Sequence, residues 1–335
     1  MIRKRKVSIE DVARRANVSI TTVSRVINNV PTVGAKNQAR VEEAIAFLKY
    51  KPDVNAQRLA SGISNAIGLV MPGYPGIFYS FYAVELIRGV GHACETIHMD
   101  MVFHITNGLN PLNPRSVGGL VFADIIENRT QVQSALDAEV PCMVINHVVT
   151  EFKVNYVGID NLLGGKLAGD YLVSLGHRRI ATVSGNLQTQ SGFQRLKGFQ
   201  EVLTASHTLL PPEYVVEGDY SRRSARSAAE KLLALPQPPT AIFAGSDDMA
   251  LEIVAVILER GMKVPQDISV IGFDDNPIAL YGPIGLTTVR QPLFEMAEQA
   301  VRYLHQIMQG KKKTLVQKIL PPQLIIRESC SAPKA

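Results

Sequence analysis

The sequence predicts two unlike parts, a small all-α domain at the N-terminus and a large α/β core of two doubly wound parallel-sheet subdomains. In the first 60 residues apolar side chains recur at helical spacing, whereas from Ile67 onward short apolar runs alternate with helical patterns. Charge divides the chain at the same place. Residues 1–60 hold 12 Lys and Arg against 5 Asp and Glu, a net of +7, so the other 275 residues hold 23 against 25, a net of −2. The whole basic excess therefore lies in the small domain.

The first helix of the small domain is predicted from its ends. Ser8 and Asp11 form a Ser-x-x-Asp capping box, which predicts a helix over residues 9–15 that Asn17 ends. Ser19 is placed to cap a second helix.

The second helix has two chemically different faces. Its inward face is apolar and consists of Val23, Val26 and Ile27. Its outward face carries Thr21, Thr22 and Arg25, a set of short hydroxyls and one arginine that suits the major groove of DNA. A third amphipathic helix is predicted over residues 35–48, with Val41, Ala44, Ile45 and Leu48 facing inward. Three such helices form a helix-turn-helix domain whose second helix enters the groove.

The concentrated positive charge supports contact with DNA phosphates independently of the helix pattern. Residues 3–6 contribute four of these charges, and for them a solvated tail is an equally good interpretation.

Residues 7–59 resemble the DNA-binding headpiece of the LacI/GalR (lactose-repressor/galactose-repressor) family of transcriptional regulators. The matching residues are Ile9-x-x-Val12-Ala13, Val18-Ser19-x-x-Thr22-Val23-Ser24-Arg25-Val26-x-Asn28 and Tyr50-x-Pro52-x-x-x-Ala56-x-x-Leu59. The resemblance implies a homodimer that reads a pseudo-palindromic operator. It places Ile20, Thr21 and Arg25 near base edges. It places Ser19, Thr22, Ser24 and Asn28 near phosphates.

The resemblance also implies a hinge helix over about residues 53–61, which folds when two copies meet in the minor groove. This segment includes Ala56, and Leu59 is expected to wedge between base pairs and kink the duplex. Asp53 replaces the family's usual Asn, and Gly34 and Asn37 replace its usual Ser and Thr. These replacements put one N-cap and some phosphate contacts in doubt.

The strands of the core are predicted from continuous apolar runs, which indicate parallel sheets covered on both faces. These runs are residues 67–70, 101–103, 119–122, 142–145, 180–183, 241–244 and 268–273. In such sheets a ligand binds beyond the carboxyl ends of the strands.

The core resembles the effector-binding part of the same family, which is similar to periplasmic sugar-binding proteins. The matching stretches are Gly158-Ile159-Asp160-Asn161, Leu175-Gly176-His177-Arg178-Arg179-Ile180-Ala181, Arg195-Leu196-x-Gly198-Phe199, Val264-Pro265-x-Asp267 through Asp274-Asp275, and Leu286-Thr287-Thr288-Val289-x-Gln291-Pro292. The resemblance implies two subdomains joined by three crossings, near residues 157–161, 287–290 and 323–326. A small molecule is expected in the cleft between them.

The domain boundaries follow from these patterns. We expect a DNA-binding domain over 1–50, a hinge over 51–63, an effector-binding core over 64–329 and a tail over 330–335. Within the core, the N-subdomain is expected at about 64–158 and 291–322, and the C-subdomain at about 159–289 and 323–329.

Five strand-end residues match effector contacts of the family: Asn146, Arg195, Tyr220, Ser246 and Asp274. Their amide, guanidinium, phenol, hydroxyl and carboxylate groups suit a sugar or related polyol. Structural alternatives remain for three of them: a loop brace for Asp274, a core position for Tyr220 and an ion pair for Arg195. Thr189 stands where some members carry Arg, which disfavours an anionic effector.

Two further features each have two interpretations. The aromatic residues Phe78, Tyr79, Phe81 and Tyr82 either stack on an effector or pack between the subdomains. The basic run at residues 177–179 is favoured as a structural loop over a DNA contact.

One stretch departs from the family. Residues 107–118 hold Pro111 and Pro114 between Gly108 and Gly118, where the family has a charged helix. The sequence predicts a short loop there and a less covered sheet edge.

Other classes of protein fit the sequence poorly. No nucleotide-binding loop, Gly-x-Ser-x-Gly motif or metal-ligand cluster is present, so we expect neither an enzyme nor a cofactor. No apolar run is long enough to span a membrane, and a capped helix replaces a signal core, which favours a cytoplasmic protein over a periplasmic binding protein. Cys94, Cys142 and Cys330 are expected to be free thiols.

The function predicted from the sequence is that of a DNA-binding regulator, in particular a repressor, controlled by a small molecule, with a carbohydrate as the favoured effector. A corepressor, a nucleobase or nucleoside, or a phosphoprotein partner remains as an alternative.

Overall fold

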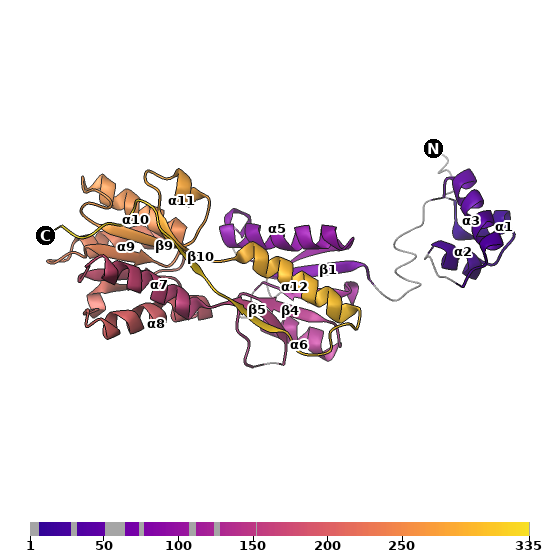
Figure 1. Cartoon of the computed structure of the whole chain (residues 1–335), viewed down its shortest axis with the longest axis horizontal. Coiled ribbons are helices and arrows are strands. Elements are labelled where there is room, and N and C mark those ends of the chain that lie inside the picture. The colour runs from indigo at the N-terminus through magenta and orange to yellow at the C-terminus, as the bar shows by residue number, and fades with distance from the viewer. Residues whose placement is uncertain are drawn as a thin grey trace. The chain divides into compact units, whose positions relative to one another are not determined.

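The computed structural model describes residues 7–27, 32–50, 64–73, 77–106, 112–123, 128–151 and 153–334. The chain divides into two compact units, Met1–Asn65 and Ala66–Ala335 (Figure 1). Hinge residues 51–63 lie outside the described residues.

The first unit is a three-helix domain made of α1 (Ile9–Ala16), α2 (Ile20–Ile27) and α3 (Ala35–Leu48). Its core is small and apolar, with Val12, Val23 and Val41 fully buried between the helices. The predicted inward residues Ile27, Ile45 and Leu48 pack around that core and are partly buried.

The helix ends follow the predicted chemistry. The Asp11 carboxylate accepts a hydrogen bond from the backbone N–H of Ser8 at 3.0 Å, and Asn17 ends α1 in the left-handed region with φ of 50°. Asn tolerates this region better than most residues because its side chain bonds to nearby backbone. Ser19 caps α2, since its Oγ accepts from the backbone N–H of Thr22 at 3.1 Å. Gly34 stands at the N-cap of α3 and supplies no side-chain bond, as its replacement of Ser implied.

The second unit contains two six-stranded sheets. The first has the order β11-β5-β4-β3-β1-β2, and all its pairs are parallel. Its strands are β1 (Ala66–Pro72), β2 (Asp100–Thr106), β3 (Gly119–Phe122), β4 (Cys142–Ile145), β5 (Asn155–Ile159) and β11 (Gln317–Leu320).

The second sheet has the order β12-β10-β9-β8-β6-β7 and is parallel except for the β10–β12 pair. Its strands are β6 (Ile180–Ser184), β7 (Val215–Glu217), β8 (Ala241–Ala244), β9 (Ser269–Asp274), β10 (Thr287–Arg290) and β12 (Gln323–Ile325). Every apolar run singled out in the sequence is a strand.

Helices cover both faces of each sheet, which confirms the doubly wound class. In the first sheet α5 (Phe81–Thr96) and α12 (Leu293–Met308) lie side by side on one face, and α6 (Arg129–Asp137) packs on the other (Figure 1). In the second sheet α7 (Asn161–Ser174) and α8 (Gln190–Ala205) cover one face. There α9 (Arg222–Leu233) and α10 (Asp247–Glu259) cover the other, and a short α11 (Ile278–Tyr281) follows β9.

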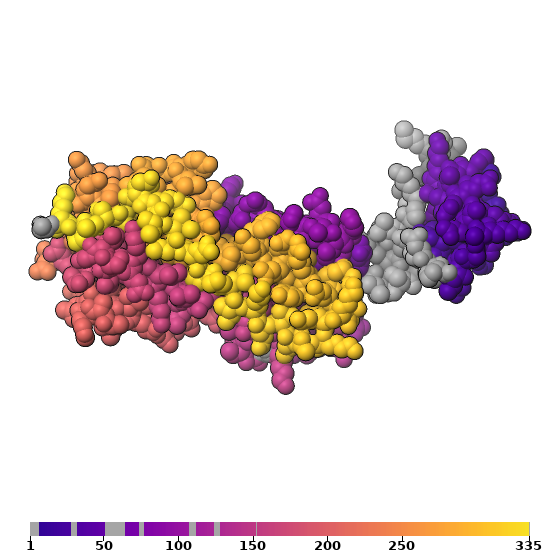
Figure 2. Space-filling view, viewed as in Figure 1, coloured from indigo at the N-terminus to yellow at the C-terminus, as the bar shows by residue number. Residues whose placement is uncertain are grey.

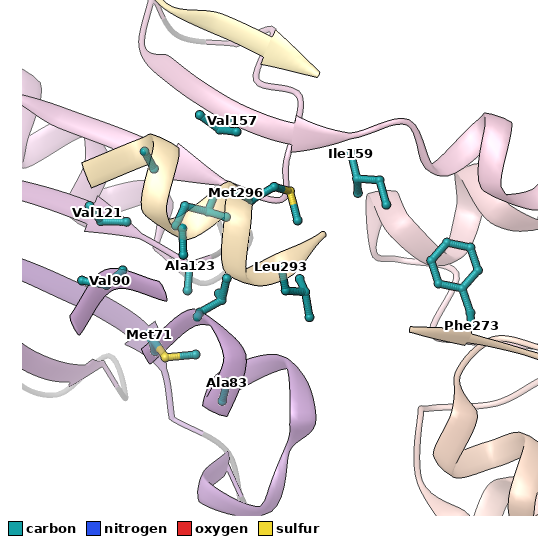
Figure 3. Close-up of a cluster of buried hydrophobic side chains, with 14 of the residues drawn as sticks. Met71, Ala83, Val90, Val121, Ala123, Val157, Ile159, Phe273, Leu293 and Met296 are labelled. Carbon is teal, nitrogen blue, oxygen red and sulfur yellow. The ribbon is translucent and has the colours of Figure 1, made fainter. Parts of the chain in front are cut away.

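Figure 3 shows the buried side chains under α12. Leu293 and Met296 of α12 meet Met71 of β1 and Ala83 of α5, and all four are at most 2% exposed. Burial of apolar side chains is the main stabilising term for such a core. Strand β1 therefore packs on an apolar layer that it shares with α5 and α12.

The chain passes between the sheets three times. It leaves β5 for α7, it leaves β10 for α12, and it leaves β11 for β12. The third crossing occupies Pro321 and Pro322, just before the expected residues 323–326. Figure 2 shows the yellow C-terminal segment at the surface of both sheet regions.

The predicted absence of a helix before β3 is confirmed for the part of this stretch that the structure describes. Between residues 112 and 118 only a single 3-10 turn forms, Pro114–Ser116, and residues 107–111 lie outside the described residues. The neighbouring strand β2 is an edge strand in which Val102 is 44% exposed and Ile105 is 38% exposed. The expected uncovering of the sheet edge is therefore present.

Candidate nucleic-acid interface and ligand cleft

The outward face of α2 carries the predicted DNA-contacting residues. Ser19, Ile20, Thr21 and Arg25 are exposed, whereas Thr22 and Ser24 are half-buried. Val23 and Val26 anchor the opposite face in the core, so the helix presents these side chains as a fixed set. The predicted residues Asn28, Ala56 and Leu59 lie outside the described residues.

The arginines of this unit are not equivalent. Arg15 lies over the ring of Phe47, with its Cζ atom 3.2 Å from the ring centroid, and Arg14 lies 3.7 Å from the Asp11 carboxylate. Arg25 makes no ion pair with any residue that the structure describes. An exposed arginine without an internal partner, on the face that the fold presents outward, is suited to bind a base edge or a phosphate.

The second unit encloses a cavity of about 580 Å³ at the carboxyl ends of the strands. It is lined by side chains that follow strands of both sheets, as expected for a doubly wound fold. All five predicted effector residues line it: Asn146, Arg195, Tyr220, Ser246 and Asp274.

Helix N-caps surround this cavity. Ser80 caps α5, Thr189 caps α8, Ser221 caps α9 and Ser246 caps α10, each by accepting a hydrogen bond from a backbone N–H one turn on. All four line the cavity. Ser246 Oγ is thus already bound to the N–H of Met249 at 3.3 Å and offers a ligand only its remaining donor and lone pair.

Arg195 is buried to 5% exposure and is held by three separate segments. Its Nε donates to Asn161 Oδ1 at 2.9 Å, its Nη1 to the Gly245 carbonyl at 2.9 Å and its Nη2 to Gln291 Oε1 at 3.4 Å. The guanidinium also stacks on Phe273, with Cζ 3.6 Å from the ring centroid. Most of its donors are therefore used by the protein, and it offers a ligand one or two N–H groups in a fixed direction.

Asp274 lies opposite Arg195 and shares Gln291 with it. The Gln291 Nε2 group donates to Asp274 Oδ1, and Arg195 Nη1 lies 4.0 Å from the same oxygen. Burial raises the pKa of Asp274 to about 7, although Arg195 and the Gln291 hydrogen bond oppose the rise. The backbone φ of 122° is unusual for a residue with a side chain, and such outliers cluster at functional sites.

Asn146 and Tyr220 complete the predicted set, and both have positive φ, 61° and 68°. The buried Oδ1 of Asn146 has no hydrogen-bond partner among the described residues. The Tyr220 hydroxyl lies 3.4 Å from Thr189 Oγ1 and 3.3 Å from Ser191 Oγ, and its ring packs against Gly185. Tyr220 thus lines the cavity and at the same time packs at the edge of the core.

Three of the four aromatic residues line the cavity, and the fourth packs within the first-sheet half of the core rather than between the subdomains. Tyr79, Phe81 and Tyr82 line the cavity, and the Tyr82 hydroxyl donates to the Ala123 carbonyl. Phe78 instead packs against Phe103 of β2, with ring centroids 5.9 Å apart.

Each of the two units contains a stretch that matches a known protein family. Residues 8–53 match the family described as bacterial regulatory proteins, lacI family, and residues 170–330 match a periplasmic binding protein-like domain. The HTH-type transcriptional regulator DegA of Bacillus subtilis is 33% identical over 338 residues, covering 97% of this chain and 98% of the relative.

The chain belongs to the LacI family.

Two solved structures of transcriptional regulators are similar over nearly the whole chain. The Lac repressor dimer bound to operator and the anti-inducer ONPF has a TM-score of 0.84 at 28% identity, covering 98% of this chain and 100% of the other. The CelR–cellobiose complex has a TM-score of 0.74 at 30% identity, covering 97% and 100%.

Sequence reasoning missed several residues of this LacI-family cleft. Gln291 joins Arg195 to Asp274, Asn161 fixes the Arg195 guanidinium, and Asp219, Arg222 and Asp248 line the cavity. Gln291 directly follows β10, so the strand-end rule that identified Asp274 also points to it. Asn161 lies two residues after β5, just as Ser246 lies two residues after β8, so the same rule could have identified it.

The remaining expectations concern buried groups. His177 is 1% exposed, with Nδ1 2.9 Å from Thr240 Oγ1 and Nε2 2.9 Å from the Ser331 carbonyl, so it is a structural residue that holds the C-terminal segment.

The three cysteines are free, and burial raises the thiol pKa of Cys142 to about 12. No helix among the described residues is long and apolar enough to cross a membrane.

Proposed function

We propose that the chain is a cytoplasmic transcriptional repressor that binds a pseudo-palindromic operator as a homodimer. A sugar or related polyol in the cleft sets its operator affinity. The first unit, with the DNA-binding domain at 1–50 and the hinge at 51–63, contacts DNA, and the core at 64–329 senses the ligand. Its cytoplasmic location follows from the proposed role, because the operator lies on the chromosome.

The observation that carries this proposal is a cavity of about 580 Å³ in which Gln291 joins Arg195 to Asp274 and the buried Oδ1 of Asn146 has no described partner. Polar groups held in fixed directions by the protein are the means by which ligand sites select hydroxyl patterns. Asn146 follows β4 of the first sheet, and Asp274 ends β9 of the second sheet. Both residues line the cavity, so one ligand can contact residues from both sheets. The cellobiose complex of a relative and the operator-bound Lac repressor dimer support the same assignment.

The coupling between the two units is a population shift. A ligand that binds more tightly to one arrangement of the two sheets favours that arrangement and changes operator affinity by the same factor by which DNA changes ligand affinity. The same cleft serves an inducer and a corepressor.

The test combines ligand binding with operator binding on the purified full-length protein. Thermal unfolding is measured against sugars, glycosides, sugar phosphates and nucleobases, and a ligand at about 100 times its Kd should stabilise the fold by roughly 2.7 kcal/mol. Each hit is then titrated into the protein–operator complex, with the operator selected from random palindromic DNA, and fluorescence anisotropy is followed. A sugar that stabilises the protein and shifts operator affinity supports the proposal, whereas a nucleobase as the sole hit would replace the carbohydrate assignment.

A further inference from the structure

Two neighbouring carboxylates at the start of α10 have opposite surroundings. Asp247 is fully buried, and its Oδ1 accepts from the Thr288 hydroxyl at 2.6 Å while its Oδ2 accepts from the Asn276 backbone N–H at 2.8 Å. Asp248 lines the cavity and is half-buried, and it makes no hydrogen bond or ion pair with the residues that the structure describes. Asp247 therefore braces the loop after β9, and Asp248 is left with both oxygens available.

The positive charges of the cavity are, in contrast, already balanced by the protein. Arg195 faces the Asp274 carboxylate at 4.0 Å and donates to three further protein acceptors. Arg222 Nε lies 3.0 Å from Glu252 Oε2 on the neighbouring helix α10. The third carboxylate of the lining, Asp219, accepts from the backbone N–H of Ser221 at 2.9 Å. Among the charged groups that line the cavity, Asp248 is the one that no described residue binds.

Two further open positions of the cavity are acceptors. Asn146 Oδ1 is buried without a partner, and Asp274 Oδ2 accepts no hydrogen bond from the described residues. A buried acceptor without a donor costs free energy unless a ligand supplies the donor. Asn146 Oδ1, the ionised Asp248 and, when ionised, Asp274 Oδ2 therefore favour a ligand that is rich in O–H or N–H groups.

We propose that Asp248 is a specificity-determining residue of the cleft that accepts hydrogen bonds from an uncharged or cationic polyol and excludes anionic sugars. Hexuronates and sugar phosphates are the excluded class. The proposal rests on the proposed function and deepens it, because it states the charge of the effector that the cleft takes.

Two other features of the cavity would by themselves favour an anionic ligand. Two arginines and the N-termini of α8, α9 and α10 line it, and both features attract anions. The internal partners of Arg195 and Arg222 reduce this attraction. Burial raises the pKa of Asp248 and the charge of Arg222 opposes that rise. Because Arg222 is itself ion-paired with Glu252 and makes no ion pair with Asp248 among the described residues, an ionised Asp248 repels an anion in the cavity. At the low effective dielectric of such a site, one unpaired charge within a few ångströms changes affinity by about tenfold or more.

The experiment measures discrimination within matched sets of sugars. Glucose, galactose and mannose are each compared with their uronate, 6-phosphate and 2-amino forms by isothermal titration on the full-length protein. The variants are Asp248→Asn, which keeps the shape and removes the charge, and Asp170→Asn, which makes the same change at an exposed carboxylate of α7 outside the cavity. The quantity compared is the ratio of affinities within one set, which a loss of folded protein leaves unchanged.

We expect the wild type to bind the uncharged or amino member of one set at least about tenfold more tightly than its anionic members. Asp248→Asn should reduce this ratio to near one, and Asp170→Asn should preserve it. Tighter binding of a uronate or phosphate by the wild type, or an unchanged ratio in Asp248→Asn, overturns the inference and leaves the sugar-responsive repressor in place. Absence of binding for every set, with operator binding intact, overturns the carbohydrate assignment itself.

Discussion

At Arg195, one side chain joins segments that lie far apart in the sequence. Its partners are 34, 50 and 96 residues away, in α7, after β8 and after β10. The position of Arg195 at the cleft was predictable from its motif. Its partners were not, because they depend on the register of three strands and on two crossings between the sheets. The sequence prediction of Arg195 as an effector contact therefore did not include these three protein partners.

Arg25 is the residue whose substitution tests the DNA-contacting face of α2. Because Arg25 is exposed and has no described ion-pair partner, Arg25→Ala should cost about 1–3 kcal/mol of operator binding and relax the preference for the selected sequence. Competition binding with single-base operator variants measures this. An equal loss on every DNA sequence would instead identify Arg25 as a phosphate contact, and Arg40→Ala on α3 serves as the charge-matched control.

Asp274 should make the stability of the ligand-free protein depend on pH. Burial raises the folded-state pKa of this carboxyl from 3.8 to about 7. The folded state therefore keeps a proton that the unfolded chain has lost above about pH 4, so the contribution of Asp274 to stability is full below about pH 4 and disappears as pH rises through 7.

Asp274→Asn cannot ionise, and it should gain stability relative to the wild type between pH 5 and pH 7, with the difference constant at higher pH. Urea unfolding at a series of pH values measures this difference. The exposed Asp170→Asn supplies the same charge change without burial, and a pH-independent difference for Asp274→Asn would contradict the expected shift.

At the scale of the elements, helices α7 and α8 approach so closely at Gly165 and Gly198 that no larger residue fits at either position. A Cβ on Gly165 would lie 2.0 Å from the Arg195 carbonyl oxygen, and a Cβ on Gly198 would lie 2.0 Å from the Leu162 carbonyl oxygen. Both obstacles are backbone atoms, so the helices would have to separate. This close packing fixes the helix that carries Arg195 against the helix that begins with its partner Asn161.

Gly165→Ala should therefore destabilise the protein by about 1–3 kcal/mol or more and weaken ligand binding. Gly91→Ala in α5, where no atom lies within 4 Å of the added Cβ, should be neutral or stabilise by up to about 1 kcal/mol. Chemical denaturation and ligand titration of both variants measure these effects. Equal stability of the two variants would show that the α7–α8 pair has room to separate.

Much of the element structure was predictable because its signals are local. The apolar runs, the Ser8 and Ser19 caps and the proline-rich stretch before β3 were each interpreted correctly from adjacent residues. The strands that the apolar-run analysis did not single out include β7 and β11, which are short and partly exposed. Their strand conformation comes from pairing with β6 and β5, so no pattern within their own residues indicates it.

At the scale of the whole molecule, the charge difference between the two units should separate their responses to salt. The first 60 residues carry a net charge of +7 and the remainder carries −2. Operator affinity should fall by about 10³-fold or more between 50 and 200 mM salt if about six or more phosphates are contacted. Binding of an uncharged ligand to the core should change little over the same range. Anisotropy and calorimetric titrations check the two responses, and a salt-insensitive operator complex would argue against phosphate contact.

The ring of helix N-caps around the cavity has a consequence for how such regulators diversify. Ser80, Thr189, Ser221 and Ser246 each cap a different helix, and each helix follows a different part of the chain, so the four caps reach the cavity separately. A replacement at one junction therefore alters one corner of the cleft and leaves the other corners, the two sheets and the DNA-reading helix unchanged. A lineage can acquire a new signal molecule in single steps at this rim while it continues to control the same genes.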